Sequence, residues 1–259
     1  MATVTDLAQR ELLSTGDALR LEGVSRSFGA LKAVEDFSFS VAAGERRAVI
    51  GANGAGKTTL FNVITGDYAA SAGRVRFFGE DVTTHPPFER IRAGMRRTYQ
   101  SSLLFRDLTV RDNLFLAVRG ISRGRFSIVR NNKNQSVEDI LERVRLARVA
   151  DEPVASLSHG QQRQLEIGMA LAGAPRLILF DEPAAGLSPV ERRELVALLA
   201  ALPAHMSFVL IEHDLEIALR VVDRVTVMHN GRLLKEGTPA EIENDPEVQE
   251  IYMGRTGHA

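Results

Sequence analysis

The run GANGAGKT at residues 51–58 decides the fold of this chain of 259 residues. It follows a short apolar run at residues 47–50 and leads into residues 58–65, which have a helical pattern. A strand, a glycine loop that ends in Lys-Thr, and a helix together form a P-loop. The glycines let backbone N–H groups surround phosphate oxygens, Lys57 neutralises their charge, and the Thr58 hydroxyl can ligate Mg²⁺. A dinucleotide-binding fold gives Lys57 and Thr58 no role, so the pattern predicts a nucleotide phosphate site.

A second motif, LILFDE at residues 177–182, has the pattern of a buried strand that ends in two carboxylates. Asp181 can hold Mg²⁺ through water, and Glu182 can polarise a water that attacks the terminal phosphate. An apolar strand can also end in an acidic pair by chance. Beside a P-loop, the pair instead predicts metal-assisted hydrolysis.

His213 follows another strand pattern, at residues 208–211, and then Glu212. If this strand is a parallel neighbour, its carboxyl end lies where open α/β sheets collect their ligands. An isolated histidine at such a place is more often structural. Together with the other motifs, it predicts a hydrogen bond from the imidazole to the γ-phosphate.

Strand and helix patterns alternate along the chain, which is typical of a parallel α/β core. The hairpin signal Asn230-Gly231 and the strand patterns before the P-loop predict antiparallel additions. Apolar residues at residues 137–149 have helical spacing. The Arg-rich stretch at residues 119–134 is expected to be a solvated face and loop, with lipid-headgroup or nucleic-acid contact as the alternative.

The composition excludes several classes of function. The chain is 44% hydrophobic, enough for a sizeable core, and its formal net charge of −1 gives no general attraction to nucleic acid or lipid. The absence of cysteine excludes disulfides, thiolate catalysis and cysteine-ligated zinc. No apolar run approaches the roughly 18 residues that span a bilayer, and the N-terminus lacks a signal-peptide pattern. We therefore expect a cytoplasmic protein that reaches a membrane only through partners.

These motifs occur in the order found in ATP-binding cassette (ABC) ATPases, which residues 19–254 resemble. LSHGQ at residues 157–161 resembles the Leu-Ser-Gly-Gly-Gln signature, which in that family binds a nucleotide held by another subunit. The resemblance implies an α/β fold: a P-loop NTPase (RecA-like) parallel-sheet core with an N-terminal antiparallel β subdomain and an inserted α-helical subdomain. The implied boundaries are an extension at 1–17, an ATPase domain at 18–254 that includes a helical subdomain at about 101–172, and a tail at 255–259.

The resemblance also implies roles for single residues. The implied catalytic residues are Glu182 as the base, His213 as the switch histidine and Gln100 as the Q-loop glutamine. Phe28 corresponds to the aromatic residue that stacks on adenine, although Phe37 and Phe39 are alternatives for a core role. The other implied ATP contacts are Asn53, Gly54, Ala55, Gly56, Lys57, Thr58 and Thr59 of one subunit and Ser158, Gly160 and Gln161 of the other. The implied Mg²⁺ ligands are Thr58, Gln100 and Asp181.

Two positions depart from the family pattern. His159 stands where the signature usually has glycine, although Ser158 and Gly160, the phosphate-facing residues, are kept. Ser188 stands where many members have aspartate, at the end of the D-loop at residues 185–188. The second departure puts the contact of the D-loop across a subunit interface in doubt.

Further motifs resemble the ATPase subunits of branched-chain amino acid importers, namely RTYQ at 97–100, LTVRDNL at 108–114, LEIGMAL at 165–171 and the tail at 237–254. The implied function is ATP hydrolysis, with Mg²⁺, that energises uptake through an integral-membrane permease at the inner face of the cell membrane. The implied partners are the permease, a second ATPase subunit (identical or related) in a head-to-tail dimer and, indirectly, a solute-binding protein, with no nucleic acid.

Three alternatives remain open. Urea and short-amide importers share much of the same pattern. A soluble ABC protein that acts on nucleic acid or ribosomes fits the balanced charge and the single cassette poorly. A P-loop phosphotransferase leaves residues 157–161 unexplained.

Overall fold

Parallel strands form the centre of the structure, a computed structural model that describes residues 16–99, 104–121 and 137–253. In this part of the chain, a six-stranded sheet has the order β10-β9-β3-β8-β7-β6. All neighbours are parallel except the antiparallel pair β9 and β10. The strand bounds are Arg46–Ile50 (β3), Met95–Arg97 (β6), Leu177–Asp181 (β7), Ser207–Ile211 (β8), Arg224–His229 (β9) and Arg232–Gly237 (β10).

The strands β7 and β8 are buried on both faces, which explains their continuous apolar sequences. Alternate residues of β7 enter different cores. Leu177 and Leu179 pack with α2 (Lys57–Thr65), whereas Ile178 and Phe180 pack with α6 (His159–Leu171) and α7 (Pro189–Ala200). The helices α8 (Leu215–Val221), α9 (Pro239–Glu243) and α10 (Pro246–Met253) contribute to a third core beside β3 and β9.

A second, antiparallel sheet has the order β2-β1-β4-β5 among the described residues. Its strands are β1 (Asp17–Phe28), β2 (Leu31–Ala42), β4 (Ala72–Phe77) and β5 (Glu80–Asp81). The strands β1 and β2 each have 12 residues, because β-bulges let the pairing continue past irregular positions. This sheet packs on α2 and therefore lies next to the P-loop.

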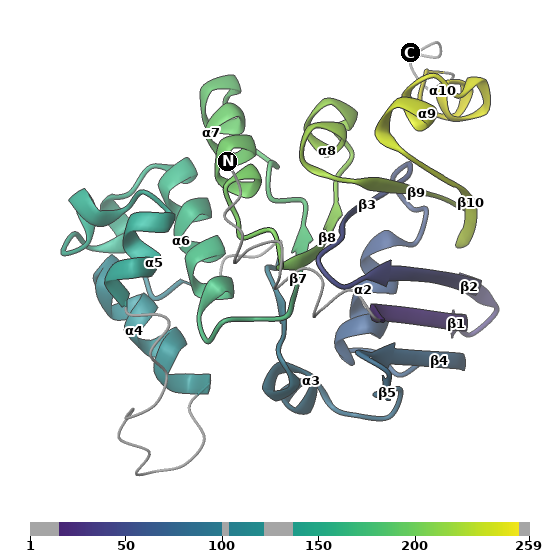
Figure 1. Ribbon diagram of the computed structural model, residues 1–259, viewed down its shortest axis with the longest axis horizontal. Helices are drawn as coiled ribbons and strands as arrows, with labels where there is room; N and C mark the ends of the chain where they lie inside the picture. The colour runs from purple at the N-terminus through teal and green to yellow at the C-terminus, as the bar shows by residue number, and fades with distance from the viewer. Residues whose placement is uncertain (1–15, 100–103, 122–136, 254–259) are drawn as a thin grey trace.

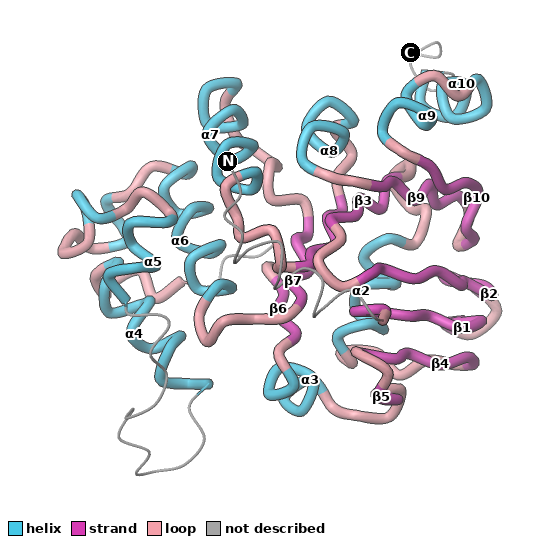
Figure 2. Tube along the Cα trace, viewed as in Figure 1, coloured by secondary structure: helices cyan, strands magenta, loops and turns pink. Residues whose placement is uncertain are grey.

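The helices α4 (Val110–Ile121), α5 (Val137–Arg143) and α6 gather on the left in Figure 1, away from the antiparallel sheet. The helix α5 is shorter than its apolar spacing predicts. The helix ends at Arg143, Arg145 has a left-handed φ of 62°, and the chain then forms a short 3-10 turn at Ala147–Val149. The helix α3 (Pro87–Ala93) lies directly before β6 along the chain (Figure 2).

The turn between β9 and β10 has the backbone that its sequence predicts. Asn230 and Gly231 have φ of 48° and 79°, and a type I′ turn requires positive φ at both positions. The Gly231 N–H donates to the Ala55 carbonyl at 2.9 Å, and the Glu35 N–H donates to the Gly231 carbonyl at 2.8 Å. The hairpin is thereby tied to the P-loop and to β2.

In the part of the chain that the structure describes, no helix has the length and apolar character needed to cross a membrane. Gln100 and most of the Arg-rich stretch at 119–134 lie outside the described residues.

Candidate functional site

The carboxyl ends of three adjacent strands carry the motifs found in the sequence. The P-loop follows β3, Glu212 and His213 follow β8, and Asp181 and Glu182 end β7. The order β3-β8-β7 places these ends side by side. The topology therefore brings the P-loop next to two segments that are more than a hundred residues away from it in the sequence.

Two glycines of the P-loop, Gly51 and Gly56, have no room for a side chain. A Cβ on Gly51 would lie 2.2 Å from the Met228 carbonyl oxygen, and a Cβ on Gly56 would lie 2.3 Å from the Ala33 carbonyl oxygen. Gly56 also has a φ of 102°, which favours glycine. The loop is thus held between β2 and β9 while its next residue starts α2.

Lys57 is the charged group at the centre of this loop and is only 5% exposed. Its ammonium group donates to the carbonyls of Gly51 at 2.7 Å and Ala52 at 3.1 Å. Burial lowers the pKa of Lys57, while the charges of Glu182, Asp181 and Glu212 act in the opposite direction. Because burial disfavours the charged ammonium, a phosphate placed beside Lys57 would stabilise its charged form.

Asp181 is 1% exposed and makes an ion pair within the core. Its Oδ2 accepts from the Arg97 guanidinium at 2.7 Å, and Arg97 also donates to the Asn62 side chain on α2 at 2.5 Å. The other carboxylate oxygen, Oδ1, is buried without a hydrogen-bond partner among the described residues. An unpaired buried carboxylate oxygen is costly unless another group binds to it.

Glu182 has an unusual backbone, with a φ of 47°. Left-handed conformations of this kind are rare for residues other than glycine and cluster at functional sites. The conformation is fixed by a hydrogen bond from the Glu182 N–H to the Ile211 carbonyl at 2.9 Å. The Glu182 Oε2 lies 3.8 Å from the Nδ1 of His213, whose side chain is about half exposed.

Glu212, next to His213, is fully buried. Its Oε1 accepts from the Ala184 N–H at 2.8 Å, while Oε2 has no hydrogen-bond partner in the described structure and lies 4.0 Å from the His213 Nδ1. Burial raises the pKa of Glu212 to about 6. A carboxyl of this kind links the end of β8 to the segment after Glu182.

A cleft of 530 Å³ opens at this edge of the sheet. Phe28 stands at the cleft and is 40% exposed, whereas Phe37 and Phe39 belong to the core. The Arg26 guanidinium lies 4.5 Å from the Phe28 ring centre, and Tyr68 meets that ring edge-on. The predicted site residues that line the cleft are Phe28, Asn53, Gly54, Ala55, Gly56, Lys57, Thr58, Thr59 and Glu182.

The signature residues lie elsewhere, at the start of α6. Ser158 caps this helix by accepting from the Gln161 N–H, and the Gln161 side chain accepts in return from the Ser158 N–H. Ser158 and His159 are exposed, and none of residues 157–161 is among the described residues that line the cleft. The imidazole of His159 lies on its own chain, with Cε1 3.1 Å from the position of a Cβ on Gly186.

Three charged residues at the site had no assigned role in the sequence analysis. Arg97 neutralises Asp181, Glu212 holds the segment after Glu182, and Glu191 accepts from the Gly160 N–H. In the sequence, Arg97 is marked only by its place in the RTYQ motif at residues 97–100. Each of the three contacts joins segments 28 to 84 residues apart, so spacing within the sequence does not reveal them.

Comparison with known proteins gives one consistent family. Residues 34–185 match the family model described as ABC transporter, and residues 234–258 match the model described as branched-chain amino acid ATP-binding cassette transporter. The chain is 36% identical over 248 residues to the high-affinity branched-chain amino acid transport ATP-binding protein BraF of Pseudomonas aeruginosa. This alignment covers 91% of the chain and 97% of BraF. LivG of Escherichia coli, which carries the same description, gives the same identity and coverage.

Solved structures agree with this result. The crystal structure of the ADP conformation of an ATP-binding cassette of an ABC transporter has a TM-score of 0.80 and 35% identity, and the match covers 93% of this chain and 100% of that one. A nucleotide-free ATP-binding cassette from an ABC transporter gives a TM-score of 0.79 and 36% identity, with 92% and 99% covered. These matches confirm the expected P-loop NTPase fold. The chain therefore belongs to the ABC transporter family, as an ATP-binding subunit that hydrolyses ATP in transport.

Proposed function

We propose that this subunit energises the uptake of branched-chain amino acids through a membrane permease. The observation that carries this proposal is the match of residues 234–258 to the branched-chain amino acid family model, outside the catalytic core. The names of BraF and LivG point to the same class of substrate. The urea and short-amide alternative shares the core motifs, and measured uptake of both classes of substrate separates the two.

ATP is proposed to bind in the cleft beside the P-loop. Phe28 lines the cleft and is partly exposed, so its ring is the proposed stacking surface for the adenine, and the loop N–H groups and Lys57 would receive the phosphates. In the free subunit the Lys57 ammonium donates to two loop carbonyls, so phosphate oxygens would replace these acceptors.

The residues present fit a Mg²⁺ ion. Mg²⁺ is commonly held by one or two protein oxygens together with substrate phosphates and water. Asp181 offers a buried oxygen, Oδ1, without a partner among the described residues, and Thr58 offers a hydroxyl in the same phosphate loop. Gln100, the third proposed ligand, lies outside the described residues. When bound, the ion would supply positive charge to the β- and γ-phosphates.

In the proposed hydrolysis, the carboxylate of Glu182 orients the attacking water and accepts a proton from it. Its left-handed backbone directs it from the end of β7 into the cleft. His213, 3.8 Å away, can donate a hydrogen bond to the γ-phosphate. Glu212 fixes the segment after Glu182 through the Ala184 N–H.

The active site is proposed to be completed by a second ATPase subunit, either a copy of this chain or a relative, in a head-to-tail arrangement. Support comes from the position of Ser158, Gly160 and Gln161, which lie at the start of α6 and not at the cleft of their own chain. The start of a helix is a favourable place for a phosphate of a nucleotide held by the facing subunit. Binding of ATP would then close the dimer, and hydrolysis would release it.

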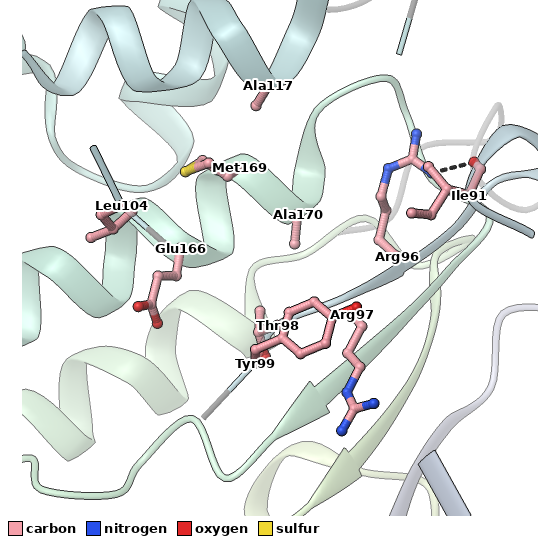
Figure 3. A pocket seen from close by; sticks show the side chains of 10 residues that line it. All are labelled: Ile91, Arg96, Arg97, Thr98, Tyr99, Leu104, Ala117, Glu166, Met169 and Ala170. Carbon is pink, nitrogen blue, oxygen red and sulfur yellow. Dashed lines mark hydrogen bonds between the residues drawn. The ribbon is translucent and has the colours of Figure 1, made fainter. Parts of the chain in front are cut away.

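The permease is proposed to dock at a cavity of 230 Å³ between the end of β6 and the helices α4 and α6 (Figure 3). The cavity is largely lined by apolar groups such as Leu104, Ala117 and Met169. It also contains Tyr99, the last described residue before Gln100, so the docked segment would be next to the proposed Mg²⁺ ligand.

The proposed function is tested by uptake measured in cells that lack this chain. Loss of the subunit should abolish high-affinity uptake of labelled leucine, isoleucine and valine, and the intact gene should restore it. The Glu182→Gln variant should bind ATP but not restore uptake, because turnover should fall by about 10²–10⁴-fold without the general base.

Uptake of labelled urea serves as the control substrate. Loss of urea uptake with normal leucine uptake would contradict the proposed substrate class. Turnover of Glu182→Gln close to that of the parent would remove Glu182 from its proposed role.

A further inference from the structure

A single carboxylate connects the signature, which would face the partner's nucleotide, to the D-loop. The Oε1 of Glu191 accepts from the Gly160 N–H of the signature at 2.9 Å. The Oε2 accepts from the N–H of Ser188, at the end of the D-loop, at 2.9 Å, and from the Ser188 hydroxyl at 2.7 Å. The two carboxylate oxygens of Glu191 thus connect the start of α6 to the start of α7.

The packing around this contact is close. A Cβ on Gly160 would lie 2.5 Å from the Glu191 Oε1 and 2.8 Å from its Cδ and Cγ. Any other residue at position 160 would displace the carboxylate, so the glycine of the signature makes room for Glu191. The hydrogen bonds from Ser188 and Gly160, together with the nearby His159, lower the pKa of Glu191. The group is therefore an anion at neutral pH.

In the free subunit, the Glu191 carboxylate accepts from the same Gly160 N–H that the proposed mechanism assigns to a phosphate. In the closed dimer, the Gly160 N–H would donate to the γ-phosphate of the ATP held by the partner. One N–H cannot fully serve both acceptors, and two anions at the same helix start repel each other. Closure must therefore break the contact between Glu191 and Gly160 or move it aside.

We propose that Glu191 is a positioning residue that occupies the phosphate-binding N–H of Gly160 in the free subunit and yields it to the γ-phosphate of the partner's ATP. The inference rests on the proposed head-to-tail site. In the free subunit, the contact holds the signature against the D-loop in a defined arrangement. During closure, Glu191 keeps its hydrogen bonds to Ser188 and releases only Gly160. ADP, which has no γ-phosphate, cannot take over the contact.

The substitution Glu191→Gln separates these two functions. A carboxylate has two acceptor oxygens, whereas an amide has one acceptor and one donor. A glutamine at the third helical position still completes a capping box, as Gln161 does at the start of α6. The variant should therefore keep the cap of α7, but it lacks the charge and the second acceptor, so the Gly160 N–H is left free.

The experiment measures ATP-driven association of the purified subunit by light scattering, in a Glu182→Gln background that prevents hydrolysis. We expect Glu191→Gln to lower the ATP concentration at half-maximal association by about tenfold, the worth of one hydrogen bond to a charged group. The affinity of the monomer for ADP should not change. Glu194→Gln, at an exposed position one turn along α7, removes the same charge and should leave both values unchanged.

The contact in the free subunit is tested separately by the NMR signal of the ¹⁵N-labelled Gly160 amide. This signal should follow the titration of a carboxyl group in the parent and should stop doing so in Glu191→Gln. A signal that does not titrate in the parent would overturn the inference, as would unchanged or weaker association in Glu191→Gln. If neither the parent nor the variant associates with ATP, a site shared between two copies of this chain is excluded and the inference is overturned with it, whereas association of the parent alone overturns only the inference.

Discussion

Glu212 is a carboxyl group in the core whose charged form is poorly accommodated. It is fully buried, one of its oxygens has no hydrogen-bond partner in the described structure, and burial raises its pKa to about 6. The ordinary pKa of a glutamate is 4.5, so between these two values the folded chain binds more protons than the unfolded chain. Below pH 4.5 the shift has no effect on stability, and above pH 6 it lowers the free energy of unfolding by about 2 kcal/mol.

The substitution Glu212→Gln removes this titration. We expect the free energy of unfolding of the variant, relative to the parent, to rise by up to about 2 kcal/mol from pH 4.5 to pH 7.5. The buried amide also changes the free energy of unfolding by an amount that does not depend on pH. The prediction therefore concerns how the difference between variant and parent changes with pH. Chemical unfolding of both proteins at a series of pH values measures it, and a constant difference across this range would contradict the raised pKa.

At the residue scale, the sequence predicts candidate functional groups but not the side chains that pair with them. The P-loop, Asp181 and Glu182 are recognisable because each chemistry needs fixed residue types at short, fixed spacings. The partners Arg97 and Glu212 depend on which strands become neighbours, and this is a property of the sheet order. Phe28 was separable from Phe37 and Phe39 only through their burial in the folded chain.

At the scale of elements, the helices and strands that present the site begin with strong local signals. The helices α6 and α7 both start with a capping box, and the second combines Ser188 as cap with proline in the first turn, as its sequence predicts. The sequence patterns predict neither β6, which has three residues, nor α3, which has seven, because such short segments give no clear periodic pattern. The end of α5 also escaped prediction because Arg145 adopts a left-handed backbone.

The cavity between β6, α4 and α6 leads to a prediction about these elements. Replacing Ala117 by arginine should fill the cavity with a long charged side chain without breaking α4, since arginine is a good helix former. We expect Ala117→Arg to lose co-purification with the permease from membranes, while the isolated subunit binds ATP normally.

Ala197→Arg adds the same side chain at an exposed position on α7 and serves as the control. It should co-purify with the permease like the parent. Retention of the permease by Ala117→Arg would place the docking surface elsewhere on the subunit.

At the scale of the whole molecule, the nucleotide cleft and the signature are separate surfaces. Ser158 does not line the cleft, so changes at this position should not affect ATP binding to a single chain. Ser158→Arg should block closure by its bulk. Ser158→Asp should block it by repulsion of the γ-phosphate, while it keeps a good helix cap.

Nucleotide binding and ATP-driven association, measured side by side in the Glu182→Gln background, test this expectation. Both variants should bind ATP with the affinity of the parent and fail to associate, whereas Ala197→Arg should associate normally. Association of Ser158→Asp at the same ATP concentration as the parent would contradict a shared site.

The left-handed backbone of Glu182 has a consequence for engineering. A non-glycine residue with a φ of 47° costs roughly 1–2 kcal/mol of stability, and glycine or asparagine would relieve that strain. A design procedure that maximises thermal stability would thus favour replacement of the very carboxylate proposed to carry hydrolysis. Position 182 should therefore be held fixed in any effort to make this ATPase more heat-resistant, because stability and turnover make opposite demands on it.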